Sequence, residues 1–205
     1  PALIDQYLVA AEHIGIAPVL LFNKVDLLDD VERETVHAQL TAYADIGYPV
    51  LYASTAQAHG LDALVGALQG HTSVFVGQSG VGKSSLIKAL LPHEEIRIGA
   101  LSERVHGRHT TSAARLYHLP TGGQVIDSPG VREFRLGHLE PDEIARGFIE
   151  LRPLLGGCKF RDCRHREEPG CRLREAVERG EVSAARFQNY LQLAEEAEAR
   201  ARARG

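Results

Sequence analysis

The sequence is poor in several features that mark particular classes of protein. Among its 205 residues there is no methionine, no tryptophan and only three cysteines. Three cysteines cannot all pair, so a secreted disulfide scaffold is disfavoured and a reducing compartment fits better. No apolar run reaches the roughly 18 residues that a membrane-spanning helix needs, and no N-terminal segment has the pattern of a signal peptide. We therefore expect a cytoplasmic protein that does not interact with membranes. We also expect it to be a monomer.

The bulk composition is that of an ordinary globular protein. Hydrophobic residues make up 44% of the chain and charged residues 24%, which suffices for one sizeable core or for one core and a small satellite domain. The formal net charge of −4 gives no general attraction to nucleic acid, so RNA binding would require a local basic patch. Because the chain opens at Pro1 and lacks methionine, we interpret it as a fragment, a processed chain or an incomplete record, and each of these leaves room for an upstream domain.

Short apolar runs alternate with helical patterns over the first two thirds of the chain. This alternation predicts an α/β fold with a mostly parallel sheet covered on both faces. The strand pattern stops after about residue 137, and the chain ends in a charged helix over 183–200, so we expect two domains, 1–137 and 138–205. Strands are predicted at 18–22, 49–53, 72–76, 114–119 and 124–126, and helices before residue 15, at 30–44, at 60–68 and up to residue 91.

A glycine-rich segment, GQSGVGKSS, matches the phosphate-loop pattern G-x-x-x-x-G-K-[ST] between a predicted strand and a predicted helix. Glycines let the backbone curl so that successive N–H groups face phosphate oxygens, and the helix N-terminus adds to this field. The pattern predicts that Lys83 reaches the β and γ phosphates and that the Ser84 hydroxyl binds Mg²⁺. The expected nucleotide-binding residues here are Gly77, Gln78, Ser79, Gly80, Val81, Gly82, Lys83, Ser84 and Ser85.

A second motif, NKVD, closes the predicted strand at 18–22 and indicates which base is bound. Asp26 can accept hydrogen bonds from the ring N–H and the exocyclic amine of guanine, a donor pair that adenine does not present. Asn23 can support the O6 side of the base, and the stem of Lys24 can lie along the ring. Ser54, which follows the predicted strand at 49–53, resembles with its neighbour Thr55 the element whose backbone N–H contacts guanine O6.

Two further motifs follow the phosphate loop in positions typical of nucleotide switches. DSPG ends the predicted strand at 124–126, so Asp127 would hold Mg²⁺ through water and the Gly130 N–H would contact the γ phosphate. GRHTT lies between the phosphate loop and DSPG, and one of its threonines can complete the ligand shell of the Mg²⁺ ion. We favour Thr111, although Thr110 is equally competent.

The two motifs expected to bind the base therefore come first in the chain, followed by the phosphate loop and then by the two switch motifs. Common GTPases instead begin with the phosphate loop. A circular permutation preserves the spatial site while moving the chain ends, which such folds tolerate because their termini lie at the surface. The order also places the second switch directly before the C-terminal domain. We hypothesise that the nucleotide state is passed straight to that domain.

All three cysteines lie in one short window together with a histidine, in the pattern C-x4-C-x-H-x5-C. Three thiolates and one imidazole suit a tetrahedral, structural Zn²⁺ ion with no open position for water. Such binding can supply about 10–16 kcal/mol of folding free energy. The alternative is three unrelated buried cysteines. The predicted ligands are Cys158, Cys163, His165 and Cys171.

Basic residues surround this cluster and form a possible RNA-binding patch. Glu167, Glu168 and Glu175 dilute the patch, so an ordinary solvated surface is the alternative interpretation. The basic residues are Lys159, Arg161, Arg164, Arg166, Arg172 and Arg174.

Together, NKVDLL, GQSGVGKSSL, GRHTT, DSPGVREF and CKFRDCRH…PGC resemble the small ribosomal subunit biogenesis GTPase family (RsgA) along nearly the whole chain. The resemblance implies a bacterial cytoplasmic GTPase that binds GTP and GDP and acts in late maturation of the 30S subunit. It implies binding to 16S rRNA and hydrolysis stimulated by the subunit. The family's N-terminal OB-fold domain has no counterpart in this sequence.

The residue after DSPG is Val131, whose apolar side chain cannot orient an attacking water as a glutamine would. The resemblance points instead to His109 in GRHTT, and an imidazole can position water or accept a proton near neutral pH. With Lys83, His109 is the predicted catalytic group. The alternative is that His109 is a switch residue and that the ribosome completes catalysis.

Three other functions remain open at the level of sequence. A P-loop ATPase or kinase with an attached zinc module is disfavoured by NKVD. A protein with little hydrolysis of its own could use GTP as a conformational latch. A zinc-dependent RNA-binding module with an inactive GTPase core is disfavoured by the intact Lys83, Ser84 and Asp127.

Overall fold

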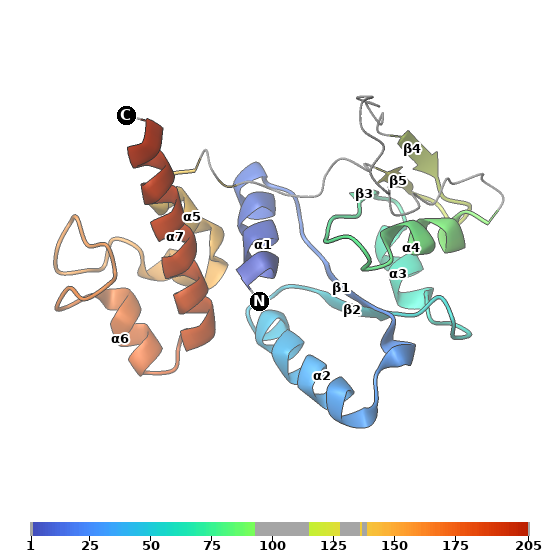
Figure 1. Ribbon diagram of the computed structural model, residues 1–205, viewed down its shortest axis with the longest axis horizontal. Helices are drawn as coiled ribbons and strands as arrows, with labels where there is room; N and C mark the ends of the chain where they lie inside the picture. Colours follow the sequence, from blue (N-terminus) through green and yellow to red (C-terminus); the bar gives the residue numbers. More distant parts are fainter. Residues whose placement is uncertain (1, 93–114, 128–135, 137–138, 205) are drawn as a thin grey trace. The chain divides into compact units, whose positions relative to one another are not determined.

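A computed structural model describes residues 2–92, 115–127, 136 and 139–204 (Figure 1). The chain forms two compact units. The first, here called the helical unit, comprises Pro1–Pro18, Ala42–Tyr48 and Phe134–Gly205, and the second, the sheet unit, comprises Val19–Thr41 and Pro49–Glu133. This grouping assigns the first helix to the same unit as the C-terminal helices. The sequence division at residue 137 remains a prediction.

The sheet unit contains two small sheets. In one, β1 (Leu20–Asn23) pairs in parallel with β2 (Val50–Ala53). In the other, β5 (Gln124–Asp127) lies between β3 (Thr72–Val74) and β4 (Arg115–His118), parallel to β3 and antiparallel to β4. Two of the three strand pairings are thus parallel, as the alternation of apolar runs and helical patterns predicts.

Helices α3 (Asp62–Leu68) and α4 (Lys83–Leu90) pack with these strands around an apolar core. The buried residues of α3 and α4 recur at helical spacing, and Val125 of β5 is fully buried among them. A 3₁₀ turn, η1 (Val25–Leu27), and α2 (Asp30–Asp45) follow β1. The core residues are Ala53, Leu64, Leu68, Leu86, Ile87, Leu90, Leu91, Leu119 and Val125.

The helical unit is built from α1 (Ala2–Ile14), α5 (Pro141–Gly147), η2 (Ile149–Leu154), α6 (Arg172–Glu178) and α7 (Ala184–Arg204). Helix α1 lies beside α5 and α7 (Figure 1). Gly147 permits this approach, because a Cβ atom there would lie 2.6 Å from a Val9 methyl group. Apolar side chains from all five elements form one core, which includes Val9, Ile144, Phe148, Leu173 and Tyr190.

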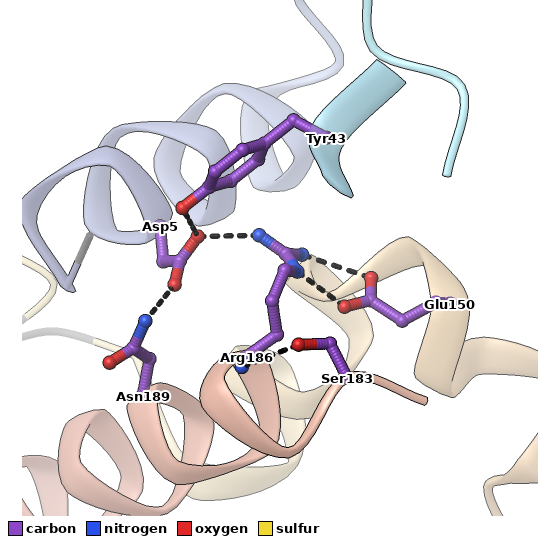
Figure 2. Close-up of polar contacts among 6 residues, drawn as sticks. All are labelled: Asp5, Tyr43, Glu150, Ser183, Arg186 and Asn189. Atoms are coloured by element: carbon purple, nitrogen blue, oxygen red, sulfur yellow. Dashed lines mark hydrogen bonds and ion pairs between the residues drawn. The ribbon is translucent and has the colours of Figure 1, made fainter. Parts of the chain in front are cut away.

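A buried ionic network also joins α1 to the C-terminal elements (Figure 2). The Arg186 guanidinium on α7 donates to Asp5 on α1, at 2.5 Å, and to both carboxylate oxygens of Glu150, at 2.5 and 2.9 Å. Asp5 also accepts hydrogen bonds from Tyr43 and Asn189. Asp5 is fully buried and Arg186 is 4% exposed, so each charge depends on its partners for compensation.

The predicted elements are confirmed within the described residues, with small shifts at their ends. The predicted strand 72–76 ends at Val74, because the chain leaves the sheet to enter the turn that begins at Gly77. The first helix ends at Ile14, and Gly15 follows with a left-handed φ of 72°. None of the helices among the described residues has both the length and the apolar character needed to cross a bilayer.

Candidate nucleotide-binding site and metal cluster

The predicted phosphate loop connects β3 to α4 as a turn built on glycines. Gly77, Gly80 and Gly82 have φ values of 146°, 86° and 97°, in the region that glycine adopts without steric cost. Gly82 is the N-cap of α4, so the turn leads directly into the positive end of a helix. The Lys83 ammonium donates to the carbonyls of Gly77, at 2.5 Å, and Gln78, at 2.7 Å, and so lies at the turn.

The NKVD motif contacts this turn directly, although 56 and 58 residues separate the bonded pairs. Asn23 Nδ2 donates to the Val81 carbonyl at 3.0 Å, and Lys24 Nζ donates to the Gly80 carbonyl at 2.9 Å. Asn23 ends β1, and Lys24 turns the chain away with a left-handed φ of 64°. The structure therefore brings the predicted base motif and the predicted phosphate loop together in one unit.

Asn23 packs tightly on the turn. A Cβ atom added to Gly82 would lie only 2.3 Å from Asn23 Nδ2. The other amide atom, Asn23 Oδ1, is buried and has no hydrogen-bond partner among the described residues. A buried acceptor without a partner is costly in a protein interior, so this corner of the site suits an added polar ligand.

Asp26 is held by Ser54 rather than by the backbone of the turn. The Ser54 hydroxyl donates to Asp26 Oδ1 at 2.5 Å and accepts a hydrogen bond from the Ala56 N–H at 3.1 Å. The Ser54 N–H donates to the Gly60 carbonyl at 3.0 Å. Ser54 is fully buried, so its hydroxyl fixes the direction of the Asp26 carboxylate.

Asp127 is the last residue of β5, the strand parallel to β3. Val74, at the end of β3, is paired with Ile126, one residue before Asp127. Because parallel strands end at the same edge of a sheet, Asp127 lies at the edge where β3 leads into the glycine turn.

The four predicted metal ligands converge in the helical unit. The ligand atoms of Cys158, Cys163, His165 and Cys171 all lie within 4.8 Å of one another. His165 Nδ1 is 3.5 Å from Cys158 Sγ and 3.4 Å from Cys171 Sγ. Zinc–sulfur bonds of about 2.3 Å in a tetrahedron place ligands about 3.5–4 Å apart, so the donor set and the spacing suit zinc.

Burial in this cluster disfavours thiolates that have no compensating positive charge. Burial raises the pKa of the Cys163 thiol to about 12 and also raises that of Cys171. Burial lowers the pKa of the His165 imidazole. Replacing thiol protons with a cation would supply the charge that the buried thiolates require.

Comparison with known proteins decides the family. The profile of the family described as RsgA GTPase matches residues 1–137, which is more than half of the chain. The chain belongs to the RsgA GTPase family. The resemblance found in the motifs is thus confirmed, and so is the circularly permuted α/β fold with its C-terminal cysteine and histidine cluster.

Curated RsgA proteins resemble the chain over nearly its whole length. The small ribosomal subunit biogenesis GTPase RsgA of Chromohalobacter salexigens is 61% identical over 191 residues, covering 93% of this chain and 56% of the relative. The protein of that name from Ectopseudomonas mendocina is 56% identical over 189 residues, covering 92% and 55%. The chain thus spans about half the length of the curated RsgA proteins it matches.

Two solved structures share the fold of this RsgA chain. The crystal structure of YjeQ from Thermotoga maritima has a TM-score of 0.78 and 34% identity, covering 96% of this chain and 65% of its own. The crystal structure described as YloQ, a circularly permuted GTPase, also has a TM-score of 0.78 and 34% identity, covering 97% and 63%.

Some predicted site residues of this RsgA chain lie outside the described residues, namely His109, Thr111 and Gly130, and so do the alternative Thr110 and the apolar Val131. Sequence reasoning also missed contacts that the structure shows. The bonds from Asn23 and Lys24 to the glycine turn join motifs too far apart in sequence for spacing to reveal them. The hydroxyl of Ser54, rather than its N–H, faces the site through Asp26.

Proposed function

We propose that this chain binds GTP and GDP and hydrolyses GTP in the maturation of the small ribosomal subunit. The observation that carries the proposal is the pair of hydrogen bonds from Asn23 and Lys24 to the Val81 and Gly80 carbonyls. These bonds hold the motif that is expected to bind guanine against the turn that is expected to bind phosphate, so one nucleotide can contact both. The names of the curated relatives support the ribosomal role.

At the base, Asp26 is the proposed reader of guanine. Its carboxylate, fixed by Ser54, would accept hydrogen bonds from the ring N–H and the exocyclic amine. Asn23 has a second Nδ2 proton for the base edge, and the Lys24 stem would lie along the ring. Since the Ser54 N–H donates to Gly60, the contact with guanine O6 is proposed for the Thr55 N–H, with Ser54 acting through Asp26.

At the phosphates, the backbone N–H groups of 77–85 would surround the oxygens, and Lys83 would exchange the Gly77 and Gln78 carbonyls for them. A bound Mg²⁺ ion would neutralise phosphate charge. Ser84 and Asp127 are its proposed ligands, Asp127 through water, together with Thr111 by the motif pattern. For Gly130 we propose the contact with the γ phosphate that its motif predicts. For His109 we propose the predicted positioning of the attacking water.

Replacing Gly82 by alanine is expected to weaken binding of GTP and GDP by at least about tenfold. A left-handed φ costs a residue with a Cβ about 1–2 kcal/mol, and that Cβ would displace Asn23 from the turn. Equilibrium titration with a fluorescent guanine nucleotide measures the loss. Gly66→Ala is the control, because Gly66 lies in α3 with nothing within 4 Å of an added Cβ. Equal affinities for the two variants would contradict the proposed site.

The metal is proposed to be one structural zinc ion bound by Cys158, Cys163, His165 and Cys171. We expect one zinc per chain by elemental analysis. A strong chelator should lower the thermal unfolding midpoint, because the ligands hold the loops between η2 and α6. Cys171→Ser should lose stoichiometric zinc during dialysis, whereas Ser183→Ala should retain it. Stoichiometric zinc in the Cys171→Ser protein would remove Cys171 from the ligand set.

The proposed partner is the 30S subunit through its 16S rRNA, in the cytoplasm, with the chain acting as a monomer. Part of the basic patch is already neutralised, because Arg166 pairs with Glu198 at 3.2 Å and Arg172 with Glu175 at 3.8 Å. Lys159 and Arg161 are exposed on the loop between Cys158 and Cys163. These two side chains are the strongest candidates for contacts with rRNA phosphates.

The proposal is tested by GTP hydrolysis measured alone, with purified 30S subunits and with 50S subunits as control. We expect stimulation by 30S subunits only. Competition of labelled GTP with ATP separates this function from that of an ATPase or kinase. Absence of stimulation by 30S subunits would remove the ribosomal role of this chain while leaving GTP binding intact.

A further inference from the structure

His165 lies at a sharp reversal of the chain within the metal cluster. Its φ of 62° is left-handed, a conformation that is strained for a residue with a side chain. The reversal brings Nδ1 within 3.5 Å of Cys158 Sγ and 3.4 Å of Cys171 Sγ. A strained residue persists where its surroundings hold it, so the neighbouring contacts must stabilise this turn.

The carboxylate of Glu168 makes those contacts. Oε1 accepts a hydrogen bond from the Arg164 N–H at 3.0 Å, and Oε2 accepts hydrogen bonds from the N–H groups of Arg166, at 2.9 Å, and Glu167, at 3.1 Å. The first two donors lie immediately before and after His165, so the carboxylate bridges the two sides of the turn.

The electrostatics agree with this geometry. The backbone N–H groups of Glu168 itself and of Arg164 are the main causes that lower the pKa of the Glu168 carboxyl, with Arg166 and Glu167 adding to them. Hydrogen bonds to an ionised acceptor are about twice as strong as neutral ones. Glu168 is only partly buried, so these hydrogen bonds outweigh the opposing effect of desolvation on its pKa.

Glu168 is not a member of the ligand set. The converging donors in the described part of the chain are Cys158, Cys163, His165 and Cys171, and both Glu168 oxygens face backbone N–H groups. On the other side of the turn, the Arg166 side chain pairs with Glu198 on α7 at 3.2 Å. The loop is thus held internally by Glu168 and against α7 by Arg166.

We propose that Glu168 is a positioning residue that presets His165 for metal binding by holding the backbone on both sides of it. The inference rests on the proposed zinc site. Glutamine at 168 keeps the shape of the side chain but replaces one acceptor by an amide donor that faces N–H groups. Residues that orient metal ligands typically contribute about 10–100-fold to affinity, and we expect a loss of that size for Glu168→Gln.

The test is a chelator competition that measures zinc affinity in the full chain, comparing wild type, Glu168→Gln and Glu167→Gln. Glu167 is exposed and adjacent, so both variants remove one negative charge from the same loop. Cobalt(II) loading adds a second readout, because its visible absorption reports the ligand set. Glu168→Gln should bind both metals more weakly with an unchanged cobalt spectrum, and Glu167→Gln should match wild type.

Other results would overturn the inference. Equal affinities for the two variants would show that the hydrogen bonds do not matter, and an altered cobalt spectrum would show that Glu168 determines which ligands bind and does not merely preset an unchanged set. If Glu168→Gln does not fold, hydrogen exchange in the zinc-loaded wild type decides. Protection of the Arg164 and Arg166 amides supports the inference, and unprotected exchange contradicts it. Failure of the wild type to bind zinc would overturn the proposed metal site as well.

Discussion

Lys83→Ala is expected to hydrolyse GTP at least about 10²–10³-fold more slowly than wild type, the loss typical when one donor to a developing charge is removed. The Lys83 ammonium is held at the glycine turn by the carbonyls of Gly77 and Gln78. We propose that the β and γ phosphates bind at this turn, where the ammonium would contact them. Without this ammonium, the negative charge that develops on the phosphate oxygens would lose one of the cations that compensate it.

Phosphate release at saturating GTP, with and without 30S subunits, measures this loss. The matched control is Lys88→Ala, which removes the same side chain from an exposed position in the last turn of the same helix. Lys88→Ala should keep wild-type turnover. Comparable rates for wild type and Lys83→Ala would show that hydrolysis does not depend on this loop.

Arg186→Met is expected to lower the free energy of unfolding by about 3–5 kcal/mol, because removing one partner leaves buried charges without compensation. The groups that would lose their cationic partner are the carboxylates of Asp5 and Glu150 (Figure 2). Burial already raises the pKa of Asp5 against the opposing effect of Arg186. The guanidinium also lies 4.8 Å from the centre of the Phe148 ring and 5.2 Å from that of Tyr43.

Urea unfolding followed by circular dichroism measures the change. Arg179→Met is the control, since Arg179 pairs with Glu181 at 2.7 Å but remains 43% exposed, and exposed pairs contribute about 0–1 kcal/mol. Adding Asp5→Asn and Glu150→Gln to Arg186→Met should recover part of the loss. If Arg186→Met lowered the free energy of unfolding no more than Arg179→Met does, the network would not stabilise the helical unit.

The helices and strands, the glycine turn and the metal-binding cluster could be predicted because each depends on a local pattern of residues. The apolar run at 18–22 predicts β1, and the glycines of 77–82 predict the turn between β3 and α4. The window that holds Cys158 to Cys171 predicts the metal cluster in the same way. In each case the residues that make the feature are close together in the chain or follow a known spacing.

Features that depend on partners distant in sequence could not be predicted. An apolar stripe on α1 shows that one face is buried, but not that Val9 packs in the same core as Phe148 and Leu173. Arg186 stands in a helix rich in charged residues and looks like a solvated side chain, although it is buried. Glu168 is a different case, because its partners are only two and four residues away, yet its residue type indicates a charge that dilutes a basic patch and not an acceptor for the backbone N–H groups around His165.

We propose above all that Asp26 reads a guanine whose phosphates lie in the turn ending at Ser84. The most direct measurement is competition between guanosine and xanthosine diphosphates on wild type and Asp26→Asn. Xanthine carries a carbonyl where guanine carries an amine, so an asparagine amide can donate to it. Hydrogen bonds to charged groups contribute about 1.5–3 kcal/mol, so we predict that Asp26→Asn loses guanosine affinity by about 10–100-fold and prefers xanthosine. Unchanged preference for guanosine diphosphate would contradict the account.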